Sequence, residues 1–358
     1  MTQFILRRVL LSVPVLIGIV FLTFALARVI PGDPCKAALG EKATEAVCAP
    51  FRERYGLNKP ITTQFAIYLN DLSHGDLGKS IRQNRPVATL LVERLPLTVE
   101  LTLYALAFAT ILGILLGRLS AVRRNSPVDV GTMVFANFGV SIPVFVLGLL
   151  LAYFFAVVLK GTPFSLPASG RLSSGVTVHS LVEVWGLEDW TGLPRAILDF
   201  LSGIYTFTAL ITGQWAALAD AVRHMILPMI ALGTIPMAII ARMTRSSLLD
   251  VLGQDYIRTA RAKGLRERFV VSRHGMRNAL LPVVTVIGLS LGGLLSGAVL
   301  TESVFNLTGI GRTITEAITG RDYIVVQGIG ILVAVLYVFI NLIVDVSYAM
   351  LDPRIRLS

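Results

Sequence analysis

Apolar runs that approach or exceed the length of a membrane-spanning helix recur along the whole chain. A helix needs about 20 mostly apolar residues to cross the hydrocarbon core of a bilayer. Only 15% of the 358 residues are charged, whereas soluble domains average about 25%. The sequence therefore predicts an all-α polytopic membrane protein with six transmembrane helices. The apolar runs occupy residues 9–30, 101–117, 130–159, 225–240, 280–300 and 325–346.

Basic residues gather in the loops that we expect to face the cytoplasm. Residues 242–277 carry nine arginines and lysines against three acidic residues. Arg118, Arg123 and Arg124 follow the second apolar run. Because cytoplasmic loops are enriched in Lys and Arg, this pattern predicts that both termini are cytoplasmic. It also accounts for the net charge of +10 without a nucleic-acid partner.

The polar stretches between the runs divide the chain into three parts. Residues 1–30 form a cytoplasmic N-terminus and the first helix, and residues 31–96 form an extracytoplasmic domain. Residues 97–358 form a membrane core with five helices, in which 160–222 is an extracytoplasmic loop and 244–278 a cytoplasmic loop. The first run could instead be a secretory signal cleaved near Ala27, but its length favours an uncleaved helix.

The residues give no sign of an enzyme or of a metal site. The two cysteines, Cys35 and Cys48, lie in the extracytoplasmic part and can form a disulfide if that side is oxidising; two unpaired thiols are the alternative. The four histidines are scattered, and no hydrolase or metalloprotease motif occurs, so we predict no catalytic residue and no bound metal. Residues 78–80 resemble the end of a P-loop, but Ser73 stands where the first glycine is required.

Polar residues inside the apolar runs are the candidates for a translocation path. Asn137 and Ser141 lie four residues apart and therefore on one face of a helix, where they could line a path or hold two helices together. Thr285, Ser290 and Ser296 are further candidates in the fifth run. The runs contain few ionisable residues, which argues against an ion-driven carrier, although such a carrier or a membrane scaffold remains an alternative.

A short charged helix is predicted between the fourth and fifth runs. Asp255 suits the N-cap, Gly264 suits the residue after the C-cap, and Gly253 can end the preceding helix. Arg261 and Lys263 lie in the last turn, where the helix dipole favours cations. This helix of about two turns could be gripped and moved by a cytoplasmic partner; a basic loop on anionic lipid is the alternative.

The same stretch resembles a known family. D-Y-I-R-T-A-R-A-K-G-L at 255–265, followed by R-N-A-L-L-P-V-V-T at 277–285, resembles the cytoplasmic coupling loop of bacterial ABC importer permeases, and most of all the dipeptide/oligopeptide branch. P-G-D-P at 31–34, H-M-I-L-P at 224–228 and D-P-R-I-R at 352–356 extend the resemblance. Thr308 and Ile324 depart from it, since the family usually has proline at both positions.

The resemblance implies a type I ABC importer permease in the bacterial cytoplasmic (inner) membrane. The partners would be a second homologous permease subunit, two cytoplasmic ATPase subunits, an extracytoplasmic peptide-binding protein and membrane lipid. The chain itself would bind no cofactor, because ATP and Mg would bind the ATPase subunits. The cargo would be dipeptides or short oligopeptides, with nickel or glutathione as the alternative. The residues that would contact the ATPase are Asp255, Tyr256, Arg258, Thr259, Ala260, Arg261, Ala262, Lys263, Gly264 and Leu265.

Overall fold

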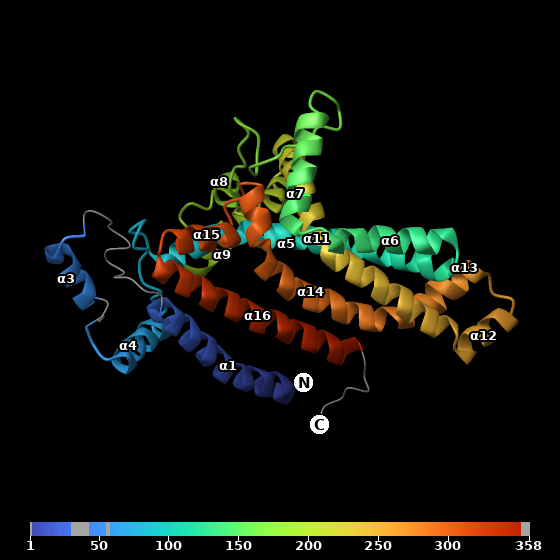
Figure 1. Cartoon of the computed structure of the whole chain (residues 1–358), viewed down its shortest axis with the longest axis horizontal. Coiled ribbons are helices and arrows are strands. Elements are labelled where there is room, and N and C mark those ends of the chain that lie inside the picture. The colour runs from blue at the N-terminus through green and yellow to red at the C-terminus, as the bar shows by residue number, and fades with distance from the viewer. Residues whose placement is uncertain (1, 30–42, 55–57, 352–358) are drawn as a thin grey trace.

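Long helices that run side by side dominate the architecture (Figure 1). The computed structural model describes residues 2–29, 43–54 and 58–351. Five helical segments within this part are long and apolar enough to cross a membrane, and a sixth exists if one bent pair counts as a single span. The predicted all-α class is confirmed. The long helices are α1 (Thr2–Val29), α5 (Val87–Val122), α11 (Trp215–Leu252), α14 (Met276–Val304) and α16 (Tyr323–Leu351).

Shorter helices fill the connections between the long ones, and the described residues form no strand beyond an isolated bridge between Lys79 and Pro86. The short helices before α11 are α3 (Glu45–Arg54), α4 (Ile61–Ser73), α6 (Pro127–Ser141), α7 (Val144–Tyr153), the π-helix η2 (Phe154–Val158), α8 (Leu181–Trp185), α9 (Gly192–Ser202) and α10 (Tyr205–Ile211). Those after α11 are α12 (Asp255–Ala262), α13 (Glu267–Phe269), the π-helix η3 (Val270–Gly275) and α15 (Ile310–Thr319).

Small residues let α5 and α11 pack closely along their length. A Cβ atom on Gly117 would lie 2.4 Å from the carbonyl oxygen of Ala241, and one on Gly233 would lie 2.7 Å from the carbonyl oxygen of Ala105. Close helix approach at small residues is the usual way in which membrane helices associate, because lipid tails leave little hydrophobic driving force between them. The α5–α11 contact is the most extensive one between helices in the described part of the chain.

A sharp corner separates α6 from α7. The two helices, which we expected to form one span over 130–159, are bent by 103°. Ile142 is extended and Pro143 is the N-cap of α7, as expected because proline disfavours the helical conformation in the residue before it. Pro143 within the apolar run 130–159 predicts a kink in the helix, but the sequence does not indicate how large the bend is. In Figure 1, α7 lies across the direction of the long helices.

Two long helices begin before the apolar runs that predict them. α5 begins at Val87, within the segment predicted to be an extracytoplasmic domain. α11 begins at Trp215, within the segment predicted to be an extracytoplasmic loop. Charged residues such as Glu93 and Asp220 occupy the first turns of these helices.

Buried polar contacts attach the segment between η2 and α11 to α5. The carboxylate of Glu100 is 1% exposed and accepts hydrogen bonds from Arg171 Nη2 at 2.5 Å and from Thr206 N at 2.8 Å. The guanidinium of Arg171 also lies 3.6 Å from the centre of the Tyr205 ring. This segment is therefore fixed by a desolvated ion pair and is not a free loop.

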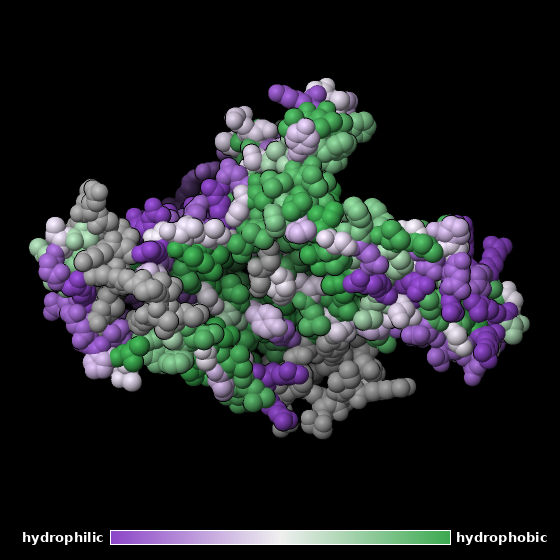
Figure 2. Space-filling view, viewed as in Figure 1, coloured by the Kyte–Doolittle hydropathy of each residue, from purple (hydrophilic) through white to green (hydrophobic). Residues whose placement is uncertain are grey.

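The surface is apolar across the middle of the bundle and hydrophilic toward the two ends of its long axis (Figure 2). Exposed apolar side chains on this surface include Leu103, Ile111, Phe138 and Phe339. Such a large exposed apolar area is expected where lipid or other membrane proteins are the neighbours. Cys48 lies in α3 with 1% of its surface exposed. Its predicted partner Cys35 is outside the described residues, so the disulfide stays a prediction.

Candidate coupling helix and translocation path

The charged stretch between the fourth and fifth apolar runs forms α12, a helix of about two turns as predicted. Gly264 has φ of +75°, the left-handed conformation that glycine adopts readily after a helix C-cap. At the other end, Gln254 and not Asp255 is the N-cap. Asp255 is the first helical residue, where its negative charge interacts favourably with the helix dipole. Its carboxylate lies 3.3 Å from Arg258 Nη1.

One face of α12 is buried against the chain itself. The side chain of Ile257 is fully buried and Ala260 is 7% exposed. Both pack with Val270 of η3, and Val251 and Leu252 at the end of α11 complete the cluster. Residues 257 and 260 lie three apart and so share a face of the helix. α12 therefore packs against the C-terminal end of α11 and the first residue of η3.

Two polar contacts fix the orientation of α12. Asn278 donates a hydrogen bond to the Tyr256 hydroxyl at 2.7 Å. Arg261 makes two hydrogen bonds to Glu267, from Nη2 at 2.8 Å and from Nε at 3.1 Å. The hydrogen bonds to Glu267 raise the pKa of Arg261 above its ordinary value, against the opposing effect of desolvation, so the guanidinium stays charged. These hydrogen bonds join α12 to Glu267 in α13 and to Asn278 at the start of α14.

The remaining side chains of α12 face away from the chain and are exposed, as are the glycine and leucine that follow. This face carries the cationic side chains of Arg258 and Lys263 beside the small side chains of Thr259 and Ala262. The small side chains would let the surface of a partner approach the helix backbone. Arg261 and Tyr256 are also exposed although they have partners within the chain. The exposed residues of α12 and of the three positions that follow it are Asp255, Tyr256, Arg258, Thr259, Arg261, Ala262, Lys263, Gly264 and Leu265.

The length of α11 determines how far α12 lies from the apolar belt. Its 38 residues correspond to about 57 Å, against a hydrocarbon thickness of about 30 Å. From Arg242 to Leu252 the helix extends about 16 Å beyond the last apolar stretch, while each headgroup layer adds only about 5–8 Å. In Figure 1, α12 lies well beyond the ends of α1 and α16. Along the axis of α11, α12 therefore lies farther from the last apolar stretch than a headgroup layer is thick.

A buried ion pair lies on α11 close to α12. Asp129, at the start of α6, is 4% exposed, and Arg245 of α11 donates to it from Nε and Nη2, both at 2.8 Å. Ser120 of α5 and the backbone N–H of Asn125 donate to the same carboxylate. The sequence does not indicate this group, because Arg245 lies 116 residues after Asp129 in the chain.

The candidate path residues do not converge in this structure. Asn137 and Ser141 are exposed on α6, and Arg242 of α11 donates to Asn137 Oδ1 at 2.7 Å, which is the helix-holding use of that amide. On α14, Ser290 donates to the carbonyl oxygen of its own helix at Val286, and Thr285 makes only a long bond of 3.5 Å to Leu281. The side chain of Ser296 is outside the described part. A path through these residues stays a prediction.

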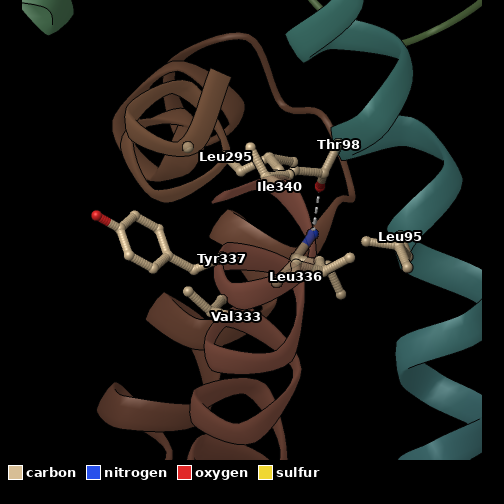
Figure 3. A pocket seen from close by; sticks show the side chains of 9 residues that line it. Leu95, Thr98, Leu295, Val333, Leu336, Tyr337 and Ile340 are labelled. Atoms are coloured by element: carbon tan, nitrogen blue, oxygen red, sulfur yellow. Dashed lines mark hydrogen bonds between the residues drawn. The ribbon is translucent and has the colours of Figure 1, made fainter. Parts of the chain in front are cut away.

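A small pocket lies between α5, α14, α16 and the start of α15 (Figure 3). Its lining is almost wholly apolar, and the polar exception is Thr98, with the Tyr337 ring on the opposite side. The Thr98 hydroxyl donates to Glu302 Oε1 at 2.7 Å and accepts from Ile310 N at 2.9 Å. Its hydrogen-bonding capacity is thus directed to α14 and α15. None of the candidate path residues lines this pocket.

The two positions that depart from the family pattern both lie at contacts between helices or loops. Arg94 of α5 donates to the carbonyl oxygen of Thr308 at 3.3 Å. Ile324 packs so closely on Gly78 that a Cβ atom there would lie 2.8 Å from its Cγ2. Next to it, the buried Asp322 accepts a hydrogen bond from Ser80 at 2.5 Å. Ser80, part of the rejected P-loop match, therefore joins the segment before α5 to the start of α16.

Comparisons with known proteins agree with these features over the whole chain. The family model described as binding-protein-dependent transport system inner membrane component matches residues 109–357, and its N-terminal counterpart matches residues 1–102. The dipeptide transport system permease protein DppB of Alkalihalophilus pseudofirmus is 45% identical over 99% of this chain and 100% of its own. The di/tripeptide permease DppB of Pseudomonas aeruginosa is 43% identical and the dipeptide permease DppB of Escherichia coli K12 is 45% identical, each over 99% of both chains. The expected resemblance is confirmed: this multi-pass membrane protein belongs to the family of binding-protein-dependent transport system inner membrane components.

Proposed function

We propose that the chain is the membrane-spanning permease subunit of an ATP-driven importer and forms the translocation path for dipeptides or short oligopeptides. The observation that carries this proposal is the similarity to permeases named for dipeptide or di/tripeptide transport, which covers 99% of the chain. It includes α12 and its supports, so the elements that would receive energy are present as well as the membrane helices. The protein is a transport subunit and not an enzyme.

The exposed face of α12 is the proposed contact with the cytoplasmic ATPase subunits. Its distance from the last apolar stretch supports a soluble partner over a headgroup layer. ATP and Mg would bind in those subunits, while a second permease and an extracytoplasmic binding protein would complete the importer in the inner membrane. Movement of α12 would pass to α11 through Val251 and Leu252, and to the start of α14 through Asn278 and Glu267.

The proposed topology has six crossings, both termini in the cytoplasm and the polar segment before α5 outside. Arg245 near the end of α11 contacts Asp129 just after the end of α5. The ends of these two helices therefore lie together, and the chain between them must return from one side of the bundle to the other. That return supports counting α6 and α7, despite their corner, as one crossing. The basic residues near α12 support the cytoplasm as the side of this contact.

The test is ATP-dependent dipeptide uptake into vesicles that carry the complete set of subunits. Gly264→Asp should abolish uptake and leave membrane insertion unchanged, because a side chain at φ of +75° strains the turn that ends α12. Gly213→Asp is the matched control, since Gly213 has φ of +71° after α10 and equally open surroundings. Uptake lost in both variants would point to general strain, and normal uptake by Gly264→Asp would remove the coupling role. Uptake of nickel and of glutathione is measured in the same vesicles to test the alternative cargo.

A further inference from the structure

The buried carboxylate of Asp129 joins three segments at one end of the bundle. It accepts hydrogen bonds from the Ser120 hydroxyl on α5, from the N–H of Asn125 at 2.9 Å in the connecting turn, and from two nitrogens of Arg245 on α11. Asn125 itself has φ of +61°, and Ser126 caps α6 by accepting from the N–H of Asp129. The turn between α5 and α6 is therefore built around this one carboxylate.

The position of Arg245 relates this group to α12. Arg245 precedes the end of α11 at Leu252 by about two helical turns, roughly 10 Å. Only Gly253 and Gln254 separate α11 from α12. A displacement of α12 along α11 would therefore reach Arg245 before any part of the helix that lies deep in the apolar belt. Through Arg245 it would reach Asp129 and the start of α6.

The geometry of the pair suits the transfer of a movement. Two parallel hydrogen bonds between a guanidinium and a carboxylate fix direction as well as distance, which a lysine cannot do. Asp129 is nearly fully buried, so water does not readily replace Arg245 as its partner. By contrast Arg242, one turn earlier on α11, bonds the exposed and neutral amide of Asn137. The contact of Arg245 with α6 is therefore more rigid than the contact of Arg242 with the same helix.

We propose that Asp129 is a positioning residue for the ATP-driven step: with Arg245 it makes the start of α6 move together with α11 when the ATPase moves α12. The inference rests on the proposed importer function and adds to it the route by which the movement reaches α6 and α7. Without the ion pair, α12 and α11 would still respond to the ATPase, but α6 would follow incompletely. ATP would then be hydrolysed with less transport.

The test measures ATP hydrolysed per dipeptide imported by the complete reconstituted importer. Asp129→Asn keeps an acceptor for the Asn125 N–H and removes the charge that holds Arg245. It should raise the ratio about tenfold, the low end of what losing a charge-assisted hydrogen bond does to an equilibrium. Ser120→Ala is the matched control, because it removes a hydrogen bond from the same carboxylate without releasing α11. It should lower thermal stability and leave the ratio unchanged.

Three outcomes decide between the possibilities. An unchanged ratio in Asp129→Asn, with a loss of stability like that of Ser120→Ala, would overturn the inference and leave the pair a purely structural one. If Asp129→Asn does not fold, Arg245→Lys takes its place: it keeps the charge, loses the paired geometry and should raise the ratio about threefold; no rise overturns the inference. Failure of the wild-type complex to import dipeptide would refute the proposed function instead, and nickel or glutathione uptake would then allow the same ratio to be measured.

Discussion

The contact between α5 and α11 at Gly117 makes a quantitative prediction. A Cβ atom added at this position would lie 2.4 Å from the carbonyl oxygen of Ala241 and 2.6 Å from Cβ of Thr244. An ordinary carbon–oxygen contact is about 3.3 Å or longer, so Gly117→Ala requires the two helices to separate by about 1 Å at this level. The obstacle is backbone, which cannot rotate away as a side-chain end could.

Two opposing terms set the size of the effect. Overpacking a tight contact costs about 1–3 kcal/mol, and a clash with backbone belongs at the upper end of that range. Alanine in a helix interior is favoured over glycine by about 1 kcal/mol. The net expectation is a loss of about 1–2 kcal/mol in the free energy of unfolding, which corresponds to a fall of about 2 °C or more in melting temperature for a chain of this size.

Gly131→Ala is the matched control for this prediction. Gly131 also lies inside a helix, α6, but a Cβ atom there would meet nothing within 4 Å. The helix preference then acts alone, and this variant should be as stable as the wild type or more so. Thermal unfolding of the purified protein in one detergent compares the three proteins. Changes of the same sign in both variants would show that close packing between α5 and α11 is not what Gly117 provides.

Two further predictions concern buried carboxylates on the other side of the bundle. Arg171→Met leaves Glu100 buried without its cation and should lower the free energy of unfolding by about 3 kcal/mol. The double variant Glu100→Gln/Arg171→Met should recover part of this loss when thermal unfolding is measured. No recovery would argue against a stabilising ion pair. Burial raises the pKa of Glu302, which lies beyond the apolar part of α14, above its ordinary value of 4.5. Folding then favours its protonated form, so stability should decrease as pH rises from 4.5 through the raised pKa, and Glu302→Gln should lack this decrease in melting curves measured across that range.

The sequence predicted the features that depend on local pattern. Hydropathy located the membrane helices, and glycines and charges located α12, whose buried residues Ile257 and Ala260 share a face as their spacing requires. Pro143 located the corner between α6 and α7. Each of these follows from residues that are close together in the chain, so a single sequence is enough to indicate them.

The features that escaped prediction depend on contacts between distant residues. Glu100 stands next to the second apolar run, and nothing in the neighbouring sequence shows that it is buried with hydrogen bonds from Arg171 and Thr206. Asp129 is buried with Arg245, which lies on another helix and far from it in the chain. The angle between α6 and α7 is likewise set by packing on α11 and α14 and not by proline alone. No spacing rule within one stretch of sequence carries this information.

The order of synthesis determines when the corner between α6 and α7 can be packed. Gly148 on α7 packs against Val304 and Phe305 at the end of α14, which follow it by about 150 residues in the chain. At the usual rate of about 5–20 residues per second, a ribosome adds that length in roughly 10–30 seconds. During this interval α7 lacks its contacts with Val304 and Phe305. The corner can therefore reach its final packing only after the fifth long apolar stretch has left the ribosome.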